Sequence, residues 1–477
     1  MWRSALPDVE VLVSVAIRRA MLLAFIAICV VVSPGRVRVR AENPPAWLEA
    51  YRGPAARLIG EATGDAFAWR RLSVLTDTIG HRLSGSPHLA RAIKWAAEEM
   101  KRDGLENVHT EKVMVPRWVR GNESAEIIEP ARQPIVMLGL GGSVATPPAG
   151  VQADILIVHG FEELDAHPAQ VRGRIVLFNV PFTSYGETVR FRSDGASRAA
   201  RHGAVAMLIR SVGLNGLRLP HTGVLQYSDD APKIPAAAVT TEDADRLERM
   251  VGRGDRVVVA LKMEAHFEAD AESANVVGEI RGREKPDEIV VVSGHLDSWD
   301  VGAGATDDGG GCVVSWEALR ILKKLNLRPR RTIRLVLWTN EENGGRGGLA
   351  YRDRHRSELG RHVMMMESDS GVFRPLGFGF SGSDRARQTV AAIASLLTGI
   401  GADQIVLNGE GADIAPSAQE GHIPTMSLEV DDSKYFLIHH TEADTIDKID
   451  PVEMARCAAA VTVMAYIVAD LPQRLGE

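Results

Sequence analysis

The sequence predicts an α/β protein with a mixed, mostly parallel central sheet flanked by helices, and with a smaller β-rich domain inserted into it. From Ser273 onward, near-continuous apolar strands alternate with helical segments, which is typical of a parallel sheet covered on both faces. Between Pro148 and Ala269, short β segments separated by Gly, Pro and Asp follow one another with few helices, which favours a separate unit. The length of 477 residues allows two or more domains.

The composition is ordinary for a globular protein and limits the classes of partner. Hydrophobic residues make up 45% of the chain and charged residues 25%. With 55 Lys and Arg against 62 Asp and Glu, the formal net charge is 55 − 62 = −7, and no sustained basic block occurs, which argues against nucleic acid as the main partner. The 3 cysteines exclude a disulfide-rich scaffold. We expect Cys312 and Cys457 to be buried in helices, and leave open whether they pair.

The N-terminal residues 1–41 are predicted to be a signal peptide. Arg18 and Arg19 precede an uncharged run, 20–33, which is too short for a comfortable membrane span but suits the core of an export signal. Val39 and Ala41 fit a cleavage after Ala41. We expect a secreted or periplasmic protein without stable membrane association once the signal is cleaved. The alternative is an uncleaved membrane anchor.

Residues 42–147 are predicted to begin the larger domain. Periodic apolar positions predict helices between Trp47 and Leu105, with an interruption at 81–86. The segment 108–113 alternates like an edge strand, and 124–128 and 134–138 are predicted strands.

Residues 148–268 are assigned to the insert, where no cluster of residues has a catalytic pattern. Helices are predicted at 197–202 and 242–253, and the turn-rich segments 182–192 and 218–233 are expected to be ordered loops.

Residues 269–477 are predicted to complete the larger domain. The predicted strands are 276–281, 288–293, 332–338, 363–367 and 425–429, and the predicted helices are 312–325, 349–356, 386–398 and 452–471.

Four of these strands end in acidic or imidazole side chains. The carboxyl ends of strands in an open α/β sheet form a binding crevice, so residues far apart in sequence can converge there. An acidic surface loop is the alternative for any one segment, but four coincidences argue against it. The segments are VSGHLDSWDVGAGATDDGGG (292–311), TNEENGG (339–345), ESDSG (367–371) and, in the loop after the last strand, HHT (439–441).

The residue types in these segments favour a metal site. Two imidazoles and several carboxylates, without suitable thiolates, suit zinc, with cobalt or manganese as substitutes. Five ligands are too many for one catalytic zinc and suit two metals that share a bridging carboxylate. Of the adjacent acids Glu341 and Glu342, one can bind metal while the other remains free as a general base. The five candidate ligands are His295, Asp307, Glu342, Asp369 and His440.

The motifs resemble those of the co-catalytic zinc peptidases, the family that includes the bacterial leucyl aminopeptidases. The resemblance covers 47–469, and the insert resembles the protease-associated domain that such peptidases carry. A closer likeness to one carboxypeptidase branch of the family rests on SWD after the first histidine, on PHTGVLQYSDDAPKIP in the insert and on DDSKYFLIHHTEADT. The family motifs are GHLDSWDVGAGATDDGGG, NEENGG, ESDSG and HHTEADT.

The resemblance implies a site with two Zn²⁺ ions per chain and Glu341 as the general base. A homodimer is implied in the same way. The ligands carried over are His295 and Asp369 for one zinc, Glu342 and His440 for the other, and Asp307 as the bridge.

Residues beside the ligands are assigned supporting roles. Asp297 is expected to orient the His295 ring and raise its basicity. The resemblance implies a cis peptide between Asp307 and Asp308. Tyr435 can donate a hydrogen bond to a tetrahedral oxyanion, although a packed loop tyrosine is an equal alternative.

Other residues of these motifs are expected to have no ligand role. His439 is expected to be structural, Asp300 a solvated loop acid and His221 a loop or interface residue. The methionines at 364–366 are expected to be a buried strand. The glycines at 309–311 lack the spacing and the Lys of a phosphate loop, so no nucleotide cofactor is expected.

The predicted function is that of an exported two-zinc exopeptidase acting on short peptides, in particular dipeptides with a free amino terminus. Glu341 would accept a proton from the metal-bridging water and pass it to the leaving amine. The alternatives are an aminopeptidase acting on longer peptides, a glutaminyl cyclase-like acyltransferase with a single metal, and a non-catalytic receptor-like binding protein. Side-chain preference and the physiological metal are not evident from the sequence.

Overall fold

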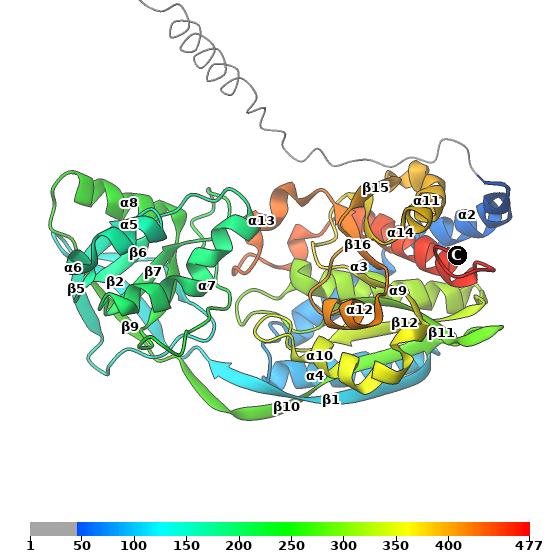
Figure 1. The fold of residues 1–477 in the computed structure, drawn as a ribbon, viewed down its shortest axis with the longest axis horizontal. Coiled ribbons are helices and arrows are strands. Elements are labelled where there is room, and N and C mark those ends of the chain that lie inside the picture. Colours follow the sequence, from blue (N-terminus) through cyan, green and yellow to red (C-terminus); the bar gives the residue numbers. More distant parts are fainter. Residues whose placement is uncertain (1–44) are drawn as a thin grey trace, which may run out of the picture. The chain divides into compact units, whose positions relative to one another are not determined.

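The computed structural model describes residues 45–477, so the predicted signal peptide, 1–41, lies outside the described residues. Eight strands form the larger sheet (Figure 1). In sheet order they are β1 (Glu106–Val119), β10 (His266–Ile280), β12 (Arg331–Trp338), β11 (Lys285–His295), β13 (His362–Glu367), β16 (Thr425–Val430), β14 (Pro375–Ser381) and β15 (Gln404–Leu407). The central strands β12, β11, β13 and β16 are parallel. Strands β1 and β10 pair antiparallel with their neighbours, and β14 pairs antiparallel with β16 and parallel with β15.

Helices and two apolar cores cover the two faces of this sheet. Along β11, Val290 and Val292 belong to one core and Ile289 and Val291 to the other, because successive side chains of a strand point to opposite faces. The first core includes residues of α2 (Glu49–Thr63), α3 (Phe67–Val74), α4 (Pro87–Arg102), α9 (Gly310–Lys324), α11 (Asp384–Ala394) and α14 (Pro451–Asp470), and the second includes residues of α10 (Arg346–His355) and α12 (Ala415–Gly421).

Helix α14 is long and apolar enough to pass as a membrane span, but it is a core helix. Of its most apolar window, 83% is buried inside the protein. It packs against α9 and α2, and its Cys457 thiol donates to the carbonyl of Phe373 at 3.0 Å. Both described cysteines, Cys312 and Cys457, are buried free thiols, so they do not pair.

Eight further strands form a second sheet, in the insert. In sheet order they are β3 (Gln133–Ile135), β2 (Glu123–Glu129), β9 (Val258–Met263), β5 (Val151–Val158), β6 (Ile175–Phe178), β7 (Ala206–Arg210), β8 (Ala236–Val239) and β4 (Met137–Gly139). Strands β5 to β8 are parallel. The insert also contains α5 (Phe161–Ala166), α6 (Pro168–Val171), α7 (Tyr185–Arg201) and α8 (Thr241–Gly252).

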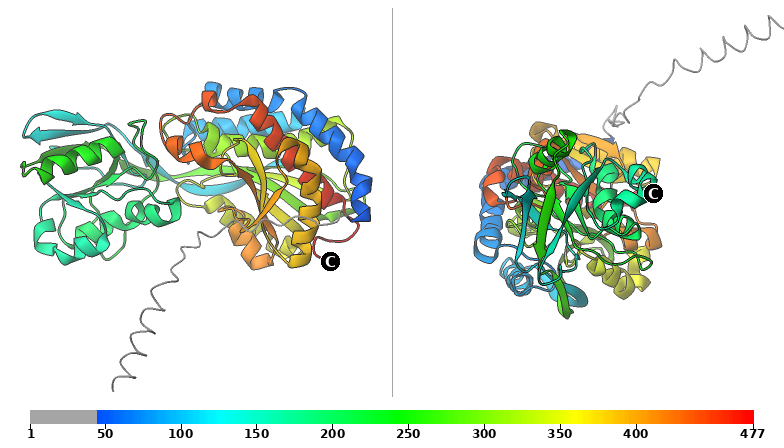
Figure 2. Two further views of the ribbon diagram at one scale, coloured as in Figure 1. Left: turned by 90° about the horizontal axis from the view of Figure 1, so that it is seen from above. Right: turned by 90° about the vertical axis from the view of Figure 1, so that its left-hand side faces the viewer.

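The long strands β1 and β10 connect the larger sheet with the insert (Figure 2). They pair antiparallel from Glu106 opposite Glu279 to Val119 opposite His266, whereas only the end of β10, from Val276, also pairs with β12. The chain therefore enters and leaves the insert along one two-stranded ribbon.

The insert's sheet begins before the boundary expected at Pro148. Strand β2 pairs with β9, the last strand of the insert, and β4 pairs with β8. Alternation along the sequence does not say which sheet a strand joins, and the structure places these segments in the sheet of the insert and not in the larger domain. The single strand expected at 134–138 is divided into β3 and β4 at Val136, whose N–H donates to Asp243 Oδ2 at 2.9 Å.

Other expectations need correction. The loop expected at 182–192 belongs to α7, which begins at Tyr185 because Ser184 caps the helix and accepts the Glu187 N–H at 3.4 Å. Strands β14 and β15 are absent from the predicted strands. In β14, Pro375, Gly377 and Gly379 obscure the strand pattern.

Asp300, expected to be a solvated loop acid, instead forms an ion pair with Arg120 at the base of the insert. Arg120 Nε donates to Asp300 Oδ2 at 2.8 Å, and its side chain is 10% exposed against 17% for Asp300. The guanidinium also lies 5.0 Å from the Trp118 ring centroid. This pair ties the loop after β11 to the chain that enters the insert.

Replacing Asp300 with Ala should lower the free energy of unfolding by about 1–3 kcal/mol, because Arg120 stays largely buried without its bidentate partner. Urea denaturation of the two proteins measures this. Asp447→Ala is the matched control: its carboxylate is 66% exposed and pairs with Lys448 at the surface, so we expect a change below about 0.5 kcal/mol. Equal losses in the two variants would contradict the role of the ion pair.

Candidate metal centre

Neighbouring strand ends bring the predicted site residues together. Because β12, β11, β13 and β16 are consecutive and parallel, their carboxyl ends lie at one edge of the sheet. Strand β11 ends at His295, β12 is followed by Glu341 and Glu342, and β13 by Asp369. His440 follows α13 (Tyr435–Ile438), the short helix after β16.

The Asp307 carboxylate lies between two imidazole rings. Its Oδ1 is 3.2 Å from His295 Nε2, and its Oδ2 is 3.1 Å from His440 Nε2. His295 Nε2 is also 3.4 Å from Asp369 Oδ1, and His440 Nε2 is 3.1 Å from Glu342 Oε2. The five predicted ligands therefore form two groups, each with its own ring and its own carboxylate, and the groups share Asp307.

Asp297 contacts both halves of the site, in a way that differs from the expected one. Its backbone carbonyl, 3.0 Å from His295 Nδ1, is the closest contact of that ring nitrogen, and its carboxylate Oδ1 is 4.0 Å away. The carboxylate instead accepts the N–H groups of Glu341, at 3.1 Å, and Glu342, at 3.3 Å. Since a carbonyl only accepts, the neutral His295 ring holds its proton on Nδ1 and has its lone pair on Nε2, the nitrogen that faces the carboxylates.

The peptide between Asp307 and Asp308 is cis, as the resemblance implied. Asp308 accepts the N–H groups of His295 and Gly311, each at 3.0 Å. A Cβ at Gly311 would lie 1.8 Å from the Ser368 carbonyl oxygen. A glycine is therefore required for α9 to begin this close to the site.

Residues of the insert hold His440. Its φ of 59° is uncommon for a residue with a side chain. Thr222 of the insert donates its N–H to the His440 carbonyl at 3.0 Å, and the Thr222 carbonyl lies 3.3 Å from His440 Nδ1. His439 stacks on His440 with ring centroids 3.6 Å apart, and its Nε2 is 3.5 Å from Asp307 Oδ2.

Burial and the density of carboxylates shift the pKa values of the site. Burial raises the pKa of Glu341 well above its usual range, and the carboxylates of Asp369 and Glu342 add to the rise. Burial acts to lower the pKa of His295, but Asp369 and Asp307 outweigh it and hold that pKa well above the usual range. These carboxylates together create a strong preference for bound positive charge.

The residues present fit divalent metal ions. Potential ligand atoms of His295, Asp307 and Glu342 lie within 4.8 Å of one another, as do those of Asp307, His439 and His440. Asp307 Oδ2 and Glu342 Oε1 are buried and receive no hydrogen bond. Buried carboxylate oxygens without a donor are unfavourable unless a cation neutralises them.

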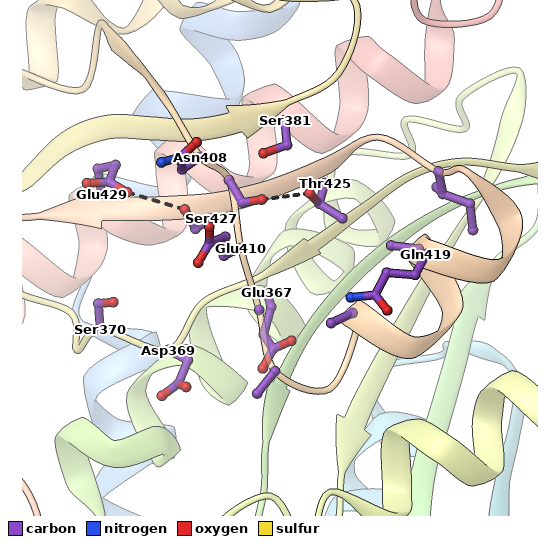
Figure 3. Close-up of a pocket in the computed structure, with 16 residues that line it drawn as sticks. Glu367, Asp369, Ser370, Ser381, Asn408, Glu410, Gln419, Thr425, Ser427 and Glu429 are labelled. Carbon is purple, nitrogen blue, oxygen red and sulfur yellow. Dashed lines mark hydrogen bonds between the residues drawn. The ribbon is translucent and has the colours of Figure 1, made fainter. Parts of the chain in front are cut away.

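Two adjoining cavities give access to these residues. The first cavity has a volume of about 380 Å³ and the second a volume of about 800 Å³. Asp369 and Ser370 line both cavities. Figure 3 shows the second cavity, whose lining residues include four carboxylates and no Lys, Arg or His. The first cavity is lined by Asp307, Glu341, Glu342, His440 and Tyr435, and by Tyr185, Arg192 and Val224 of the insert.

Tyr435 and His221 lie near the candidate metal centre, but neither side chain forms a hydrogen bond with any of the five predicted ligands. Burial raises the pKa of Tyr435 well above its usual range. Burial lowers the pKa of His221 to about 3, and this ring fills the space above Gly213.

Sequence reasoning missed Asp444 and Asp413. Asp444 accepts the N–H groups of Ala305, Thr306 and Asp307 at 3.1, 2.7 and 3.1 Å, so it fixes the loop that presents the Asp307 carboxylate. Its position in the HHTEADT motif is the one sequence feature that indicates a role for Asp444 in the site. Asp413 is 1% exposed, and no hydrogen bond reaches its carboxylate oxygens. Nothing in the sequence around Asp413 indicates that burial.

A buried cluster of carboxylates and imidazoles at the carboxyl edge of a parallel sheet, with a partly exposed Glu341 beside it, defines a candidate metal-dependent hydrolase. Residues 275–465 match peptidase family M28, and residues 139–247 match the PA domain. The chain belongs to peptidase family M28, carries a PA domain and is a metallopeptidase.

Relatives and solved structures agree with this assignment. Carboxypeptidase Q of Mus musculus is 47% identical over 408 residues, which cover 86% of this chain and 87% of that protein, and Carboxypeptidase Q of Homo sapiens is 47% identical with 86% of each covered. The crystal structure of a Peptidase M28 precursor from Shewanella amazonensis has a TM-score of 0.86 at 34% identity, covering 90% of this chain and 99% of that one. A zinc aminopeptidase from Bacillus subtilis shares the fold, with a TM-score of 0.65 at 22% identity and 86% and 98% covered. The expected family, fold class and carboxypeptidase branch are confirmed.

Asp444→Ala should weaken divalent metal binding about 10- to 100-fold, because the loop that presents Asp307 loses four hydrogen bonds, three from backbone N–H groups and one from the Thr306 hydroxyl. Competition with a chromophoric chelator measures the affinity. Glu442→Ala, two residues away and exposed, is the matched control and should bind metal like the wild type. Unchanged affinity in Asp444→Ala would show that the loop holds its conformation without this carboxylate.

Proposed function

We propose that the protein is an exported di-zinc exopeptidase that hydrolyses short peptides, in particular dipeptides with a free amino terminus. The observation that carries the proposal is the Asp307 carboxylate, which presents one oxygen to His295 and the other to His440. A carboxylate placed in this way suits a bridge between two metal ions.

In this proposal each zinc has two ligands of its own and shares one. The short distances between ring and carboxylate within each group support the division, and the Bacillus subtilis relative is described as a zinc aminopeptidase. When bound, the zinc ions would lower the pKa of the attacking water and would polarise the scissile carbonyl. The residues proposed to hold it are His295 and Asp369, then Glu342 and His440, with Asp307 between them.

Glu341 is proposed as the general base. Its side chain is 22% exposed and lines the smaller cavity, so a substrate can reach it. Among the described residues no hydrogen-bond donor occupies its carboxylate, although the Asp297 carboxylate fixes its backbone N–H. Glu341 accepts a proton from the attacking water and then donates it to the nitrogen of the leaving amine.

Supporting residues are proposed to orient these groups. Asp297 and Asp308 hold His295 and the Glu341–Glu342 peptide through the hydrogen bonds described above. Tyr435 lines the same cavity and is proposed to contact the substrate or the oxyanion.

The relatives named Carboxypeptidase Q favour a dipeptide or carboxypeptidase reaction over trimming of longer peptides. Comparing the hydrolysis of a dipeptide, its N-acetylated form and a pentapeptide separates these candidates. Rapid release of the first residue from the pentapeptide would favour the aminopeptidase alternative.

The domain boundaries, the export and the oligomeric state complete the proposal. We take the PA-type insert as residues 123–263, the limits of its sheet, and the rest of the mature chain as catalytic. Export and cleavage after Ala41 are supported by the sequence pattern, and a homodimer by the resemblance alone. N-terminal sequencing of the exported protein tests the cleavage.

Glu341→Gln should reduce kcat for dipeptide hydrolysis at least about 1,000-fold while metal content is unchanged, because the amide cannot accept a proton. Steady-state kinetics with elemental analysis of the same sample measures both. Glu442→Gln is the control, with wild-type activity expected. Hydrolysis at the wild-type rate by Glu341→Gln would remove Glu341 as the base.

The purified protein should contain about two zinc ions per chain, and His295→Ala and His440→Ala should each retain about one or fewer, since each ring belongs to a different group. Mass-spectrometric metal analysis after dialysis gives the stoichiometry. About one zinc in the wild type would instead favour the single-metal acyltransferase alternative.

A further inference from the structure

Arg192, on α7 of the insert, lines the same cavity as Asp307, Glu341 and Glu342. Its side chain is almost fully enclosed, with the residue 4% exposed. It is the only Lys or Arg among the residues that line this cavity. The insert, whose sequence has no catalytic pattern, therefore supplies the permanent positive charge of this cavity.

The hydrogen bonds of Arg192 leave part of its guanidinium unused. Nη2 donates to the Tyr185 hydroxyl at 2.8 Å, and Nε and Nη1 donate to the carbonyls of Val224 and Thr222 at the long distances of 3.3 and 3.4 Å. No described carboxylate pairs with it. Because a guanidinium has five N–H groups, donors remain for a ligand.

The other buried arginines in the part of the chain that the structure describes pair with a carboxylate or donate to several backbone carbonyls. Arg71 pairs with Asp103, Arg331 with Glu288 and Arg334 with Glu279. Arg82, which has no such pair, donates four hydrogen bonds to backbone carbonyls at 2.6 to 2.9 Å. Arg192 has no carboxylate partner among the described residues, and only one of its three hydrogen bonds is shorter than 3.3 Å. A buried charge that is compensated this weakly is unfavourable, so Arg192 indicates an anionic partner from outside the chain.

The surroundings of Arg192 hold the guanidinium in place. A Cβ at Gly223 would lie 2.2 Å from Arg192 Nη1, so this glycine makes room for it. The Tyr185 ring packs at 5.2 Å on His439, which stacks on His440. The cavity of about 380 Å³ has the size of a small-ligand site, and one residue spans about 3.5 Å, so a substrate reaching from the metal centre to Arg192 is short.

We propose that Arg192 binds the free α-carboxylate of the substrate residue that follows the scissile bond. This assignment rests on the proposed peptidase function and makes it more specific. The substrates are peptides whose C-terminal carboxylate lies one residue beyond the cleaved bond, with dipeptides as the smallest. Arginine suits this role because its planar guanidinium binds a carboxylate through two parallel hydrogen bonds.

The test compares the dipeptide Ala-Ala with its C-terminal amide, Ala-Ala-NH₂, on the zinc-loaded mature protein. Wild type should cleave Ala-Ala with a kcat/KM about 100-fold above that of the amide, because the amide leaves the buried guanidinium without its anionic partner. In Arg192→Gln this ratio should fall to near one, and in Arg192→Lys to about ten, because lysine keeps the charge without the bidentate geometry. Arg190→Gln, an exposed arginine of the same helix, should keep the wild-type ratio.

Binding measured by calorimetry to the metal-loaded Glu341→Gln protein gives a second readout. Ala-Ala should bind more tightly than Ala-Ala-NH₂, and the difference should disappear when Arg192→Gln is added. Equal kcat/KM of the wild type for the two peptides would overturn the proposal, as would an unchanged ratio in Arg192→Gln. If Glu341→Gln cleaves Ala-Ala like the wild type, the proposed base fails, and the ratio measured in Arg192→Gln still decides the role of Arg192.

Discussion

The crowding of buried carboxylates at one edge of the larger sheet is the constraint on which the rest of the site depends. These acids differ in how they are compensated. One set accepts backbone N–H groups, which stabilise a carboxylate without supplying a full charge. The other set receives no backbone N–H and faces the imidazole rings or the cavity, where only cations can compensate it. The first set is Asp297, Asp308, Glu367 and Asp444, and the second is Asp307, Glu341, Glu342 and Asp369.

This division explains which parts of the site could be predicted from the sequence. The apolar runs of β11, β12 and β13 and the polar residues directly after them are local patterns, and parallel strand ends converge by geometry alone. His295, Glu342 and Asp369 could therefore be placed on one edge before the structure was known. The split between Glu341 and Glu342 required the resemblance, because their spacing alone allows either to bind metal.

What could not be predicted depends on long-range contacts. Asp444 reaches the loop before Asp307 across more than a hundred residues of sequence. Strands β2 and β4 join the insert because of partners found much later in the chain, and alternation does not name a partner. Arg192 lay in a segment expected to be a loop, and its orientation follows from the helix that Ser184 caps.

The insert contributes residues to the candidate site and is more than an appended module. Thr222 holds the backbone and the ring of His440 through two hydrogen bonds, and Arg192 lines the cavity that His440 also lines. Besides Asp369, which lines both cavities, the larger cavity is lined by three carboxylates and by no Lys, Arg or His, whereas the smaller one has Arg192 beside its carboxylates. A zwitterionic dipeptide has the complementary arrangement, with an ammonium group at one end and a carboxylate at the other. The arrangement would orient such a substrate before any side chain is recognised, so selection by length and by termini can precede selection by sequence.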